Sequence, residues 1–390
     1  MLDRFIGANN TARKRLLVLI VSLVTIWLVF QVSTGGLFFT PRNFYNLAVQ
    51  SSVVAVLTIG MVIVIATKNI DLSVGSLLGL VGMVVAVLQI RILPPDVWWN
   101  TPVTILVALV LGALLGLWQG FLVAYFKIPS FVVTLSGLLI FRGISTEVAR
   151  GETVSPFLDS YRIFGGGAKG SIGETWSWIV AAILIAAIAF GLLRTLVAKS
   201  ENKPFRVISM IAAVMIVLFI TSMFNAYDMP RTDFGHGMPS TVLILLSVGI
   251  IASFVVARTP IGKHIFAVGQ DIEAARLVGV PTRLVVLKVF AAMGVLCAIG
   301  AVISTARLNA GTANLGTLLE LNVIAAAVIG GASLNGGRGS VLGGIIGAII
   351  IQSLDTGLVL MSVTSSQRQI LIGFVLLAAV WLDSVTVKSK

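Results

Sequence analysis

The chain of 390 residues is 57% hydrophobic and only 11% charged, and its formal net charge at pH 7 is +12. Soluble domains reach about 45–50% hydrophobic residues and carry about 25% charged residues. Apolar surface in this proportion cannot be hidden from water within one fold, so the composition predicts a protein surrounded by lipid. It excludes a soluble enzyme, a disordered chain and a nucleic-acid-binding protein.

Apolar runs long enough to cross a bilayer follow one another along the chain. We expect clear spans at 16–33, 47–67, 72–90, 103–124, 129–145, 176–197, 207–224, 239–256, 285–304, 340–358 and 369–385. A shorter run, 321–333, is either a short span or a re-entrant segment packed inside the protein. Because the runs are continuous and not alternating, they predict an all-α polytopic membrane protein of about 10 to 12 transmembrane helices.

Lysine and arginine between the spans indicate how the chain is oriented. With the N-terminus inside, eighteen of the 27 basic residues and six of the 15 acidic residues fall on the inner side. The outer side then carries nine of each and no net charge. The whole excess of positive charge is therefore cytoplasmic, which is the usual bias of membrane proteins and needs no acidic ligand to explain it. Both termini are expected in the cytoplasm.

The chain is expected to form one transmembrane domain over residues 1–390. Its parts, in chain order, are N-terminal helices at 15–145, an outer loop at 146–175, a helix pair at 176–224 with an inner loop at 194–206, and C-terminal helices at 239–390 with an inner loop at 257–284. No loop is long enough to hold a folded nucleotide-hydrolysing or sugar-binding domain.

Residues 69–75 (Asn-Ile-Asp-Leu-Ser-Val-Gly) interrupt two apolar runs and contain Asp71, the most membrane-embedded acid of the chain. An ionisable group near lipid is costly and is usually functional or paired. Alternatively, Asp71 caps the next helix by accepting the N–H of Ser73 or Val74. Both roles are compatible if the turn lies in a cavity lined by protein.

A glycine-rich segment at 330–340 has the glycine spacing of a phosphate-binding loop, but Gly337 and Arg338 stand where Gly-Lys-Ser/Thr is required. We therefore expect a tight cytoplasmic hairpin there. Its end, Gly-Ser-Val-Leu-Gly at 339–343, is similar to Gly-Ser-Leu-Leu-Gly at 75–79. The similarity indicates either an internal repeat or close helix packing through small residues.

Other candidates for chemistry are few. The two histidines, His236 and His264, are expected on opposite sides of the membrane, and the single cysteine, Cys297, lies in an apolar run. Without a cluster of Cys and His, we expect no metal, no cofactor and no catalytic residue. Glu320 and Asp355 are expected at the outer ends of late spans, where they either line a vestibule or are solvated.

The inner loop at 257–284 contains a segment typical of a short amphipathic helix. Asp271 is placed to cap it, and Glu273 falls in its first turn, where the helix dipole favours an acid. Ala274 and Ala275 keep one side flat, and Gly279 ends the helix. Such a helix is either a docking element for a partner or an ordinary interfacial helix.

That segment, 267–280 (Ala-Val-Gly-Gln-Asp-Ile-Glu-Ala-Ala-Arg-Leu-Val-Gly-Val), resembles the cytoplasmic coupling loop of permease subunits from bacterial ABC monosaccharide importers. Three more blocks resemble motifs of that family in the same order, at 70–76, 128–135 and 320–340. The resemblance covers roughly residues 43 to 381. The additional helix pair around 194–206 makes the chain most similar to the longer, xylose-type permeases.

The resemblance implies a transport permease of the bacterial inner membrane, not an enzyme, that imports a pentose or similar sugar, with D-xylose as the first expectation. Its implied partners are a second copy of the chain, a periplasmic sugar-binding protein, a cytoplasmic ATPase with tandem nucleotide-binding halves, and membrane lipid, but no nucleic acid. The residues implied in coupling to the ATPase are Asp271, Glu273, Ala274, Ala275, Arg276 and Gly279. The residues implied in the translocation pathway or its gate are Asp71, Ser73, Asn309, Asn322, Ser333 and Asn335.

Rival interpretations remain open at the level of sequence. Within ABC permeases, the substrate is alternatively ribose, arabinose, galactose, several sugars or a branched-chain amino acid. A secondary transporter driven by protons or sodium usually needs acids near the bilayer centre, and only Asp71 approaches that position. A channel or a structural scaffold would not need the helix at 271–279.

Overall fold

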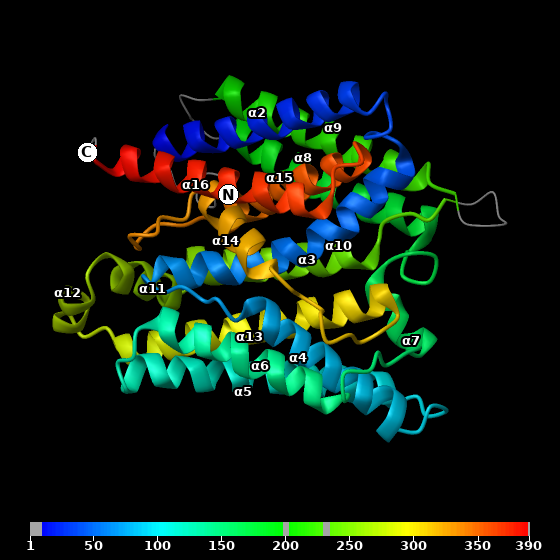
Figure 1. Ribbon diagram of the computed structural model, residues 1–390. Helices are drawn as coiled ribbons and strands as arrows, with labels where there is room; N and C mark the ends of the chain where they lie inside the picture. Colours follow the sequence, from blue (N-terminus) through cyan, green and yellow to red (C-terminus); the bar gives the residue numbers. More distant parts are fainter. Residues whose placement is uncertain (1–9, 198–202, 229–234, 389–390) are drawn as a thin grey trace.

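The computed structural model describes residues 10–197, 203–228 and 235–388 of the chain (Figure 1). These residues form helices and loops with a few isolated bridges but no strand, so the expected all-α class is confirmed. Ten of the described helices are long and apolar enough to cross a membrane. They are α2 (Asn10–Ser33), α3 (Pro41–Ala66), α4 (Val74–Val87, continued by η1, Leu88–Ile92), α5 (Asn100–Tyr125), α6 (Ser130–Val148), α8 (Gly173–Val197), α9 (Lys203–Asn225), α10 (Ser240–Arg258), α13 (Thr282–Leu308) and α15 (Val341–Leu360).

The remaining helices are shorter or lie at the end of the chain. They are α7 (Asp159–Arg162) with η2 (Ile163–Gly165), α11 (Pro260–Gln270), α12 (Ile272–Leu277), α14 (Leu319–Ile329) and α16 (Ser365–Lys388). The expected span at 369–385 falls in α16, which is not among the ten. The expected inner loop at 194–206 joins α8 to α9, and its residues 198–202 lie outside the described part.

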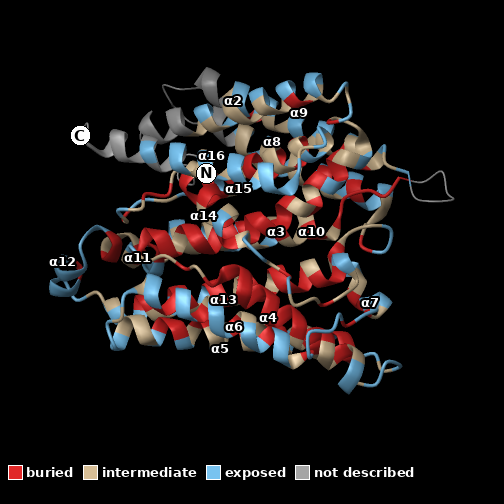
Figure 2. Cartoon of the chain, in the orientation of Figure 1, coloured by how far each residue is buried: buried red, intermediate tan, exposed pale blue. Residues whose placement is uncertain are grey.

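Helix α3 forms the centre of the bundle (Figure 2). In its most apolar stretch 83% of the residues are buried, against 6% in α2 at the periphery. It packs against α15, α13 and α14, which explains why its sequence is apolar on every side. The largest cluster of the core therefore surrounds α3, α4, α13 and α14, and two smaller clusters complete the core of the described residues.

The most extensive helix contact joins α5 to α13, and glycines make it possible. A Cβ on Gly112 or Gly116 would overlap a backbone carbonyl of α13, and a Cβ on Gly294 would overlap the carbonyl of Gly112. The two backbones thus touch without side chains between them, as small residues allow in membrane bundles.

Gly294→Ala is expected to lower the stability of the protein, because the added methyl has no space at the α5–α13 contact. Overpacking of this kind costs about 1–3 kcal/mol. Gly143→Ala in α6 is the matched control, since a Cβ there meets nothing within 4 Å. The measurement is the thermal unfolding midpoint in detergent, and equal midpoints for the two variants would contradict the close backbone contact.

Two segments cross the bundle only partly as helices. After α3 ends, residues 67–73 turn back toward the middle, and α4 begins there (Figure 1). After α13 ends, residues 309–318 likewise return to the middle before α14 begins. The first turns of α4 and α14 meet, because a Cβ on Gly75 would overlap the carbonyl of Gly316 and the carboxylate of Glu320. The short run expected at 321–333 therefore forms a half-length helix packed within the protein.

The loop at 146–175, which we expect on the outer side, folds back onto the same region. Val154 exchanges two backbone hydrogen bonds with Gly311, of 3.0 and 2.9 Å. The hydroxyls of Tyr161 and Thr305 lie 2.9 Å apart, and burial raises the pKa of Tyr161, so this phenol stays neutral. The loop thus covers the C-terminal end of α13 and anchors the start of the 309–318 segment.

Candidate functional site

The turn between α3 and α4 buries a small polar cluster, which we call the Asp71 cluster (Asp71, Ser73 and Gln119). Asp71 is 1% exposed, and its Oδ1 accepts hydrogen bonds from the Ser73 backbone N–H at 2.8 Å and the Ser73 hydroxyl at 2.6 Å. The Gln119 amide of α5 donates to the same hydroxyl at 2.8 Å. Asp71 therefore accepts the Ser73 N–H as expected, although α4 begins at Val74.

Two buried carboxylate oxygens in this region have no hydrogen-bond partner within the described chain, Asp71 Oδ2 and Glu320 Oε2. Glu320 is only 8% exposed, so it is neither solvated nor in an open vestibule. The reason is the 309–318 segment, which carries the chain inward before α14 starts. Arg142 of α6 holds that segment by donating from Nη1 to the carbonyls of Ala313 and Leu315, at 2.9 and 2.8 Å.

The expected pathway residues do not form one group. Asp71 and Ser73 lie together in the interior. Asn309 ends α13 and accepts a backbone hydrogen bond of 3.0 Å from the outer loop, and Asn322 lies half-buried on α14. Ser333 and Asn335 belong to the loop between α14 and α15, the first buried and the second exposed. The sequence analysis missed Gln119 and Arg142, although each is an isolated polar residue in an otherwise apolar run.

Helix α12 has the ends that the sequence predicts. Asp271 Oδ1 accepts hydrogen bonds from the backbone N–H groups of Glu273 and Ala274, at 2.9 and 3.0 Å, and Gly279 beyond the helix has a φ of +83°. The helix lies beyond the ends of α5 and α13, at the far left of Figure 1. Both ends of the expected 271–279 element are therefore defined by local hydrogen bonding and backbone conformation.

The residues that α12 exposes are not all those that the sequence analysis assigns to coupling. Ala275 is 4% exposed and packs onto its own chain, whereas Leu277 is 88% exposed and Val278 is 78% exposed. Ile272 at the start of the helix is also exposed. Large apolar side chains this exposed at the tip of a loop favour a contact with another protein. We call Ile272, Leu277 and Val278 the apolar tip of α12.

The backbone just before α12 packs closely against the end of α3 and the loop between α14 and α15. We call this contact the glycine junction (Ala66, Gly269 and Gly337). The Gly337 N–H donates to the carbonyl of Ala66 at 3.0 Å, and a Cβ on Gly269 would overlap that carbonyl. Lys68 Nζ donates to the carbonyl of Gln270 at 3.1 Å. The junction thus joins the end of α11, which leads into α12, to the loop that carries Asp71 and to the loop between α14 and α15.

The described residues contain no group of three or more His, Cys, Asp or Glu that could hold a metal. Cys297 is buried in α13. His236 stacks on Tyr227, with ring centroids 4.3 Å apart, in the packing under α9. Asp355 pairs with Arg368 at 2.6 Å. These residues are accounted for by packing and pairing.

The family described as "Branched-chain amino acid transport system / permease component" matches residues 43–380. The chain belongs to this permease family. It is 39% identical over 379 residues to the xylose transport system permease protein XylH of Haemophilus influenzae, which covers 94% of this chain and 95% of the relative. It is 40% identical over 382 residues to XylH of Escherichia coli K12, covering 95% and 91% of the two chains.

The ribose import permease protein RbsC of Escherichia coli K12 is 32% identical over 368 residues, covering 94% of this permease and 92% of the relative. No solved structure matches. The expected resemblance to ABC sugar permeases is therefore confirmed over almost the whole chain. With its ten apolar helices, the permease is a multi-pass protein of the bacterial inner membrane.

Proposed function

We propose that this permease forms the translocation pathway of an ATP-driven importer for a pentose, with D-xylose as the first candidate. The observation that carries the proposal is the 39–40% identity to XylH permeases over at least 91% of each chain. The lower identity of 32% to RbsC makes ribose the second candidate.

Helix α12 is the proposed coupling element to a separate cytoplasmic ATPase. Its apolar tip supplies the surface that the ATPase buries, and the exposed side chains of Glu273 and Arg276 form the polar rim. Asp271 and Gly279 fix the two ends of the helix, Ala275 packs onto its own chain, and the exposed Ala274 belongs to the proposed docking surface. This arrangement requires α12 and both termini in the cytoplasm, in agreement with the distribution of lysine and arginine.

The meeting point of α4 and α14 is the proposed gate of the pathway. Gly75 and Gly316 bring the backbones of the two segments together with no side chain between them, which supports placing the gate here. A neutral sugar needs hydrogen-bonding groups and not a charge lattice, and the Asp71 cluster supplies carboxylate, hydroxyl and amide groups. Half-helices whose first turns meet inside the bundle are a common way to build such a site in transporters. A second copy of the chain and a periplasmic sugar-binding protein complete the proposed importer.

The test is uptake of radiolabelled sugars into proteoliposomes that hold the permease with its ATPase and internal ATP. Xylose uptake is expected only when the sugar-binding protein is added outside, and it should exceed ribose uptake. Leucine is the control substrate, because the family also serves branched-chain amino acids; preferred leucine uptake would overturn the sugar assignment. Sugar uptake by the permease alone, driven by an ion gradient, would overturn the ATP-driven importer.

A further inference from the structure

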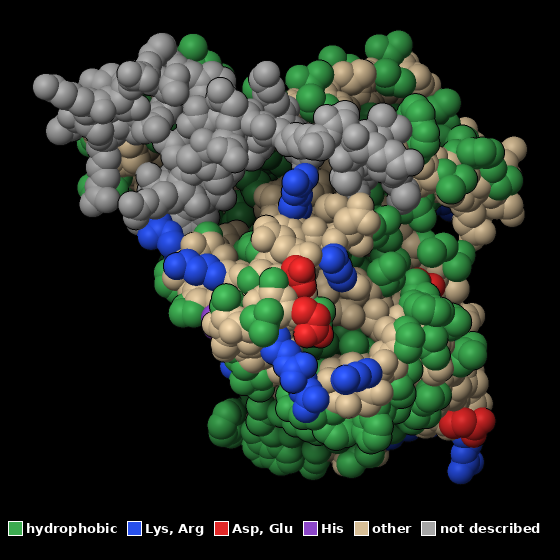
Figure 3. All heavy atoms as spheres, turned by 90° about the vertical axis from the view of Figure 1, so that its left-hand side faces the viewer, with side chains coloured by type: hydrophobic (Ala, Val, Ile, Leu, Met, Phe, Trp, Pro, Cys, Tyr) green, Lys and Arg blue, Asp and Glu red, His purple; other side chains and the backbone are tan. Residues whose placement is uncertain are grey.

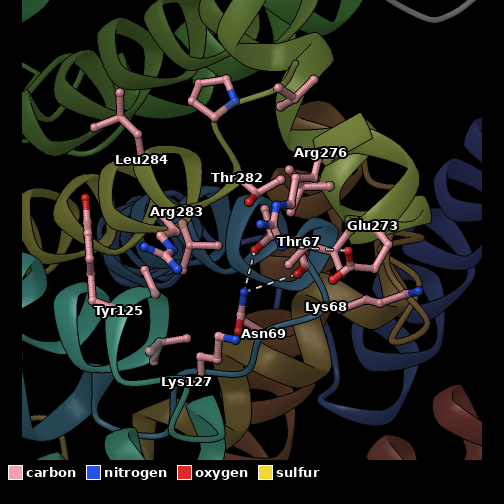
Figure 4. A pocket seen from close by; sticks show the side chains of 17 residues that line it. Thr67, Lys68, Asn69, Tyr125, Lys127, Glu273, Arg276, Thr282, Arg283 and Leu284 are labelled. Atoms are coloured by element: carbon pink, nitrogen blue, oxygen red, sulfur yellow. Dashed lines mark hydrogen bonds and ion pairs between the residues drawn. The ribbon is translucent and has the colours of Figure 1, made fainter. Parts of the chain in front are cut away.

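A cavity of about 790 Å³ lies beside α12 on the face that Figure 3 turns toward the viewer. Its walls come from the loop after α3, the C-terminal end of α5, α12 and the first turn of α13 (Figure 4). Basic and acidic side chains gather on this face around the hollow. The cavity is therefore part of the same surface as the apolar tip of α12.

The charges that line this cavity are unbalanced. Lys68, Lys127, Arg276 and Arg283 line it, whereas Glu273 is the single acid among its lining residues. Glu273 and Arg276 approach only to 4.0 Å, with side chains 75% and 71% exposed, and such pairs contribute little in water. We call this site the basic cavity.

Three of the four cations remain available to a ligand, because Lys68 is bonded to Gln270 but the pair of Arg276 with Glu273 contributes little. Arg283 lies over the ring of Tyr125, 5.6 Å from its centroid, which orients the guanidinium without neutralising it. Lys127 makes no ion pair with any described residue. Figure 4 shows Arg276 and Arg283 directed into the same hollow from α12 and α13. Guanidinium groups so placed suit a carboxylate, which they bind with paired hydrogen bonds.

The transported molecule does not explain these charges, because a pentose is neutral. The inward bias of lysine and arginine explains cations on this face but not their position around one cavity next to the docking helix. We propose that the basic cavity receives a carboxylate-bearing segment of the ATPase subunit that docks on α12. This inference rests on the proposed coupling role of α12, since a partner that buries Leu277 and Val278 would also lie over the cavity.

The position of the cavity would let the proposed contact act on the segment that leads to Asp71. Thr67 and Asn69, which line it, are joined by hydrogen bonds of 3.1 and 2.9 Å from the Asn69 amide. They begin the segment that leads to Asp71. A carboxylate held in the cavity would therefore contact α12 and the interrupted crossing at once, and its withdrawal would act on both.

The test compares two double variants with the same change of charge. Lys127→Glu/Arg283→Glu reverses two cations of the cavity, and Lys263→Glu/Arg338→Glu reverses two exposed cations on other cytoplasmic segments. Binding of the purified ATPase subunit is titrated on permease in nanodiscs of neutral phosphatidylcholine, at several salt concentrations. The cavity variant should raise Kd about tenfold or more and flatten its salt dependence. The control variant should change Kd by less than about twofold.

Equal weakening by both double variants, or no effect of the cavity variant, would overturn the inference. An effect of the cavity variant that occurs only in nanodiscs with phosphatidylglycerol would assign the cavity to an anionic lipid headgroup and would also overturn it. Failure of the native permease to bind the ATPase would instead overturn the coupling role of α12. The two failures are thus distinguishable within one experiment.

Discussion

Leu277→Asp is expected to abolish ATP-driven sugar uptake while the permease remains folded. Leu277 is 88% exposed, so the isolated chain loses no packing when this side chain is changed. In the proposed docked complex the leucine would be buried, and a buried unpaired carboxylate there is strongly unfavourable. Loss of an anchor of this kind weakens binding by about 2–4 kcal/mol. The measurement is uptake in proteoliposomes together with the thermal unfolding midpoint of the variant.

Leu277→Met is the matched control, because it keeps an apolar side chain of similar volume. It should retain uptake and ATPase binding. Substitutions of Ala275 are a poorer probe, since this residue is buried against its own chain and a larger side chain would displace α12 itself. Full uptake by Leu277→Asp would remove the apolar tip of α12 from the docking surface.

Asp71→Leu is expected to destabilise the permease far more than Asp71→Asn. Leucine leaves the N–H and the hydroxyl of Ser73 without their acceptor in a buried site, at a cost of about 1–3 kcal/mol for each group. Asparagine keeps the accepting oxygen, and its amide nitrogen takes the place of Oδ2, which has no hydrogen bond to any described residue. Thermal unfolding midpoints and uptake rates measure the two effects separately.

Asp271 provides a comparison within the same chain. It accepts two backbone hydrogen bonds in a similar turn, but it is exposed, so Asp271→Leu should cost only about 1 kcal/mol. Equal loss of uptake in Asp71→Asn and Asp71→Leu, with Asp71→Asn normally folded, would show that the charge of Asp71 and not its hydrogen bonds to Ser73 is required. That result would favour a role of Asp71 in coupling transport to an ion.

Features that depend on neighbours in sequence were predictable. The cap formed by Asp271, the glycine after α12 and the interruption at 69–75 all follow from residues a few positions apart. The predicted helix ends were less accurate where a helix continues from its apolar run into polar residues. Helix α3 starts at Pro41 and not near 47, because a proline in the first turn extends the helix beyond its apolar run.

Features that depend on distant segments were not predictable. Arg142 bonds to carbonyls more than 170 positions away, and nothing near it in sequence indicates that 309–318 turns inward. For the same reason Glu320 was expected at an outer end. Which face of α12 packs inward could not be predicted either, because a helix of six residues is too short for its apolar pattern to indicate it.

The glycine junction has a consequence for how the transporter is assembled. A helix as short as α12 is unstable alone, so its position is set by the segments that Gly269 and Gly337 bring against Ala66. Ala66 is more than 200 positions from both glycines, so the junction forms only once the late helices have been inserted. Given the proposed coupling role of α12, an incomplete or misfolded permease would therefore present no finished docking helix. Recruitment of the ATPase would then serve as a proofreading step, and the cell would not hydrolyse ATP on incomplete transporters.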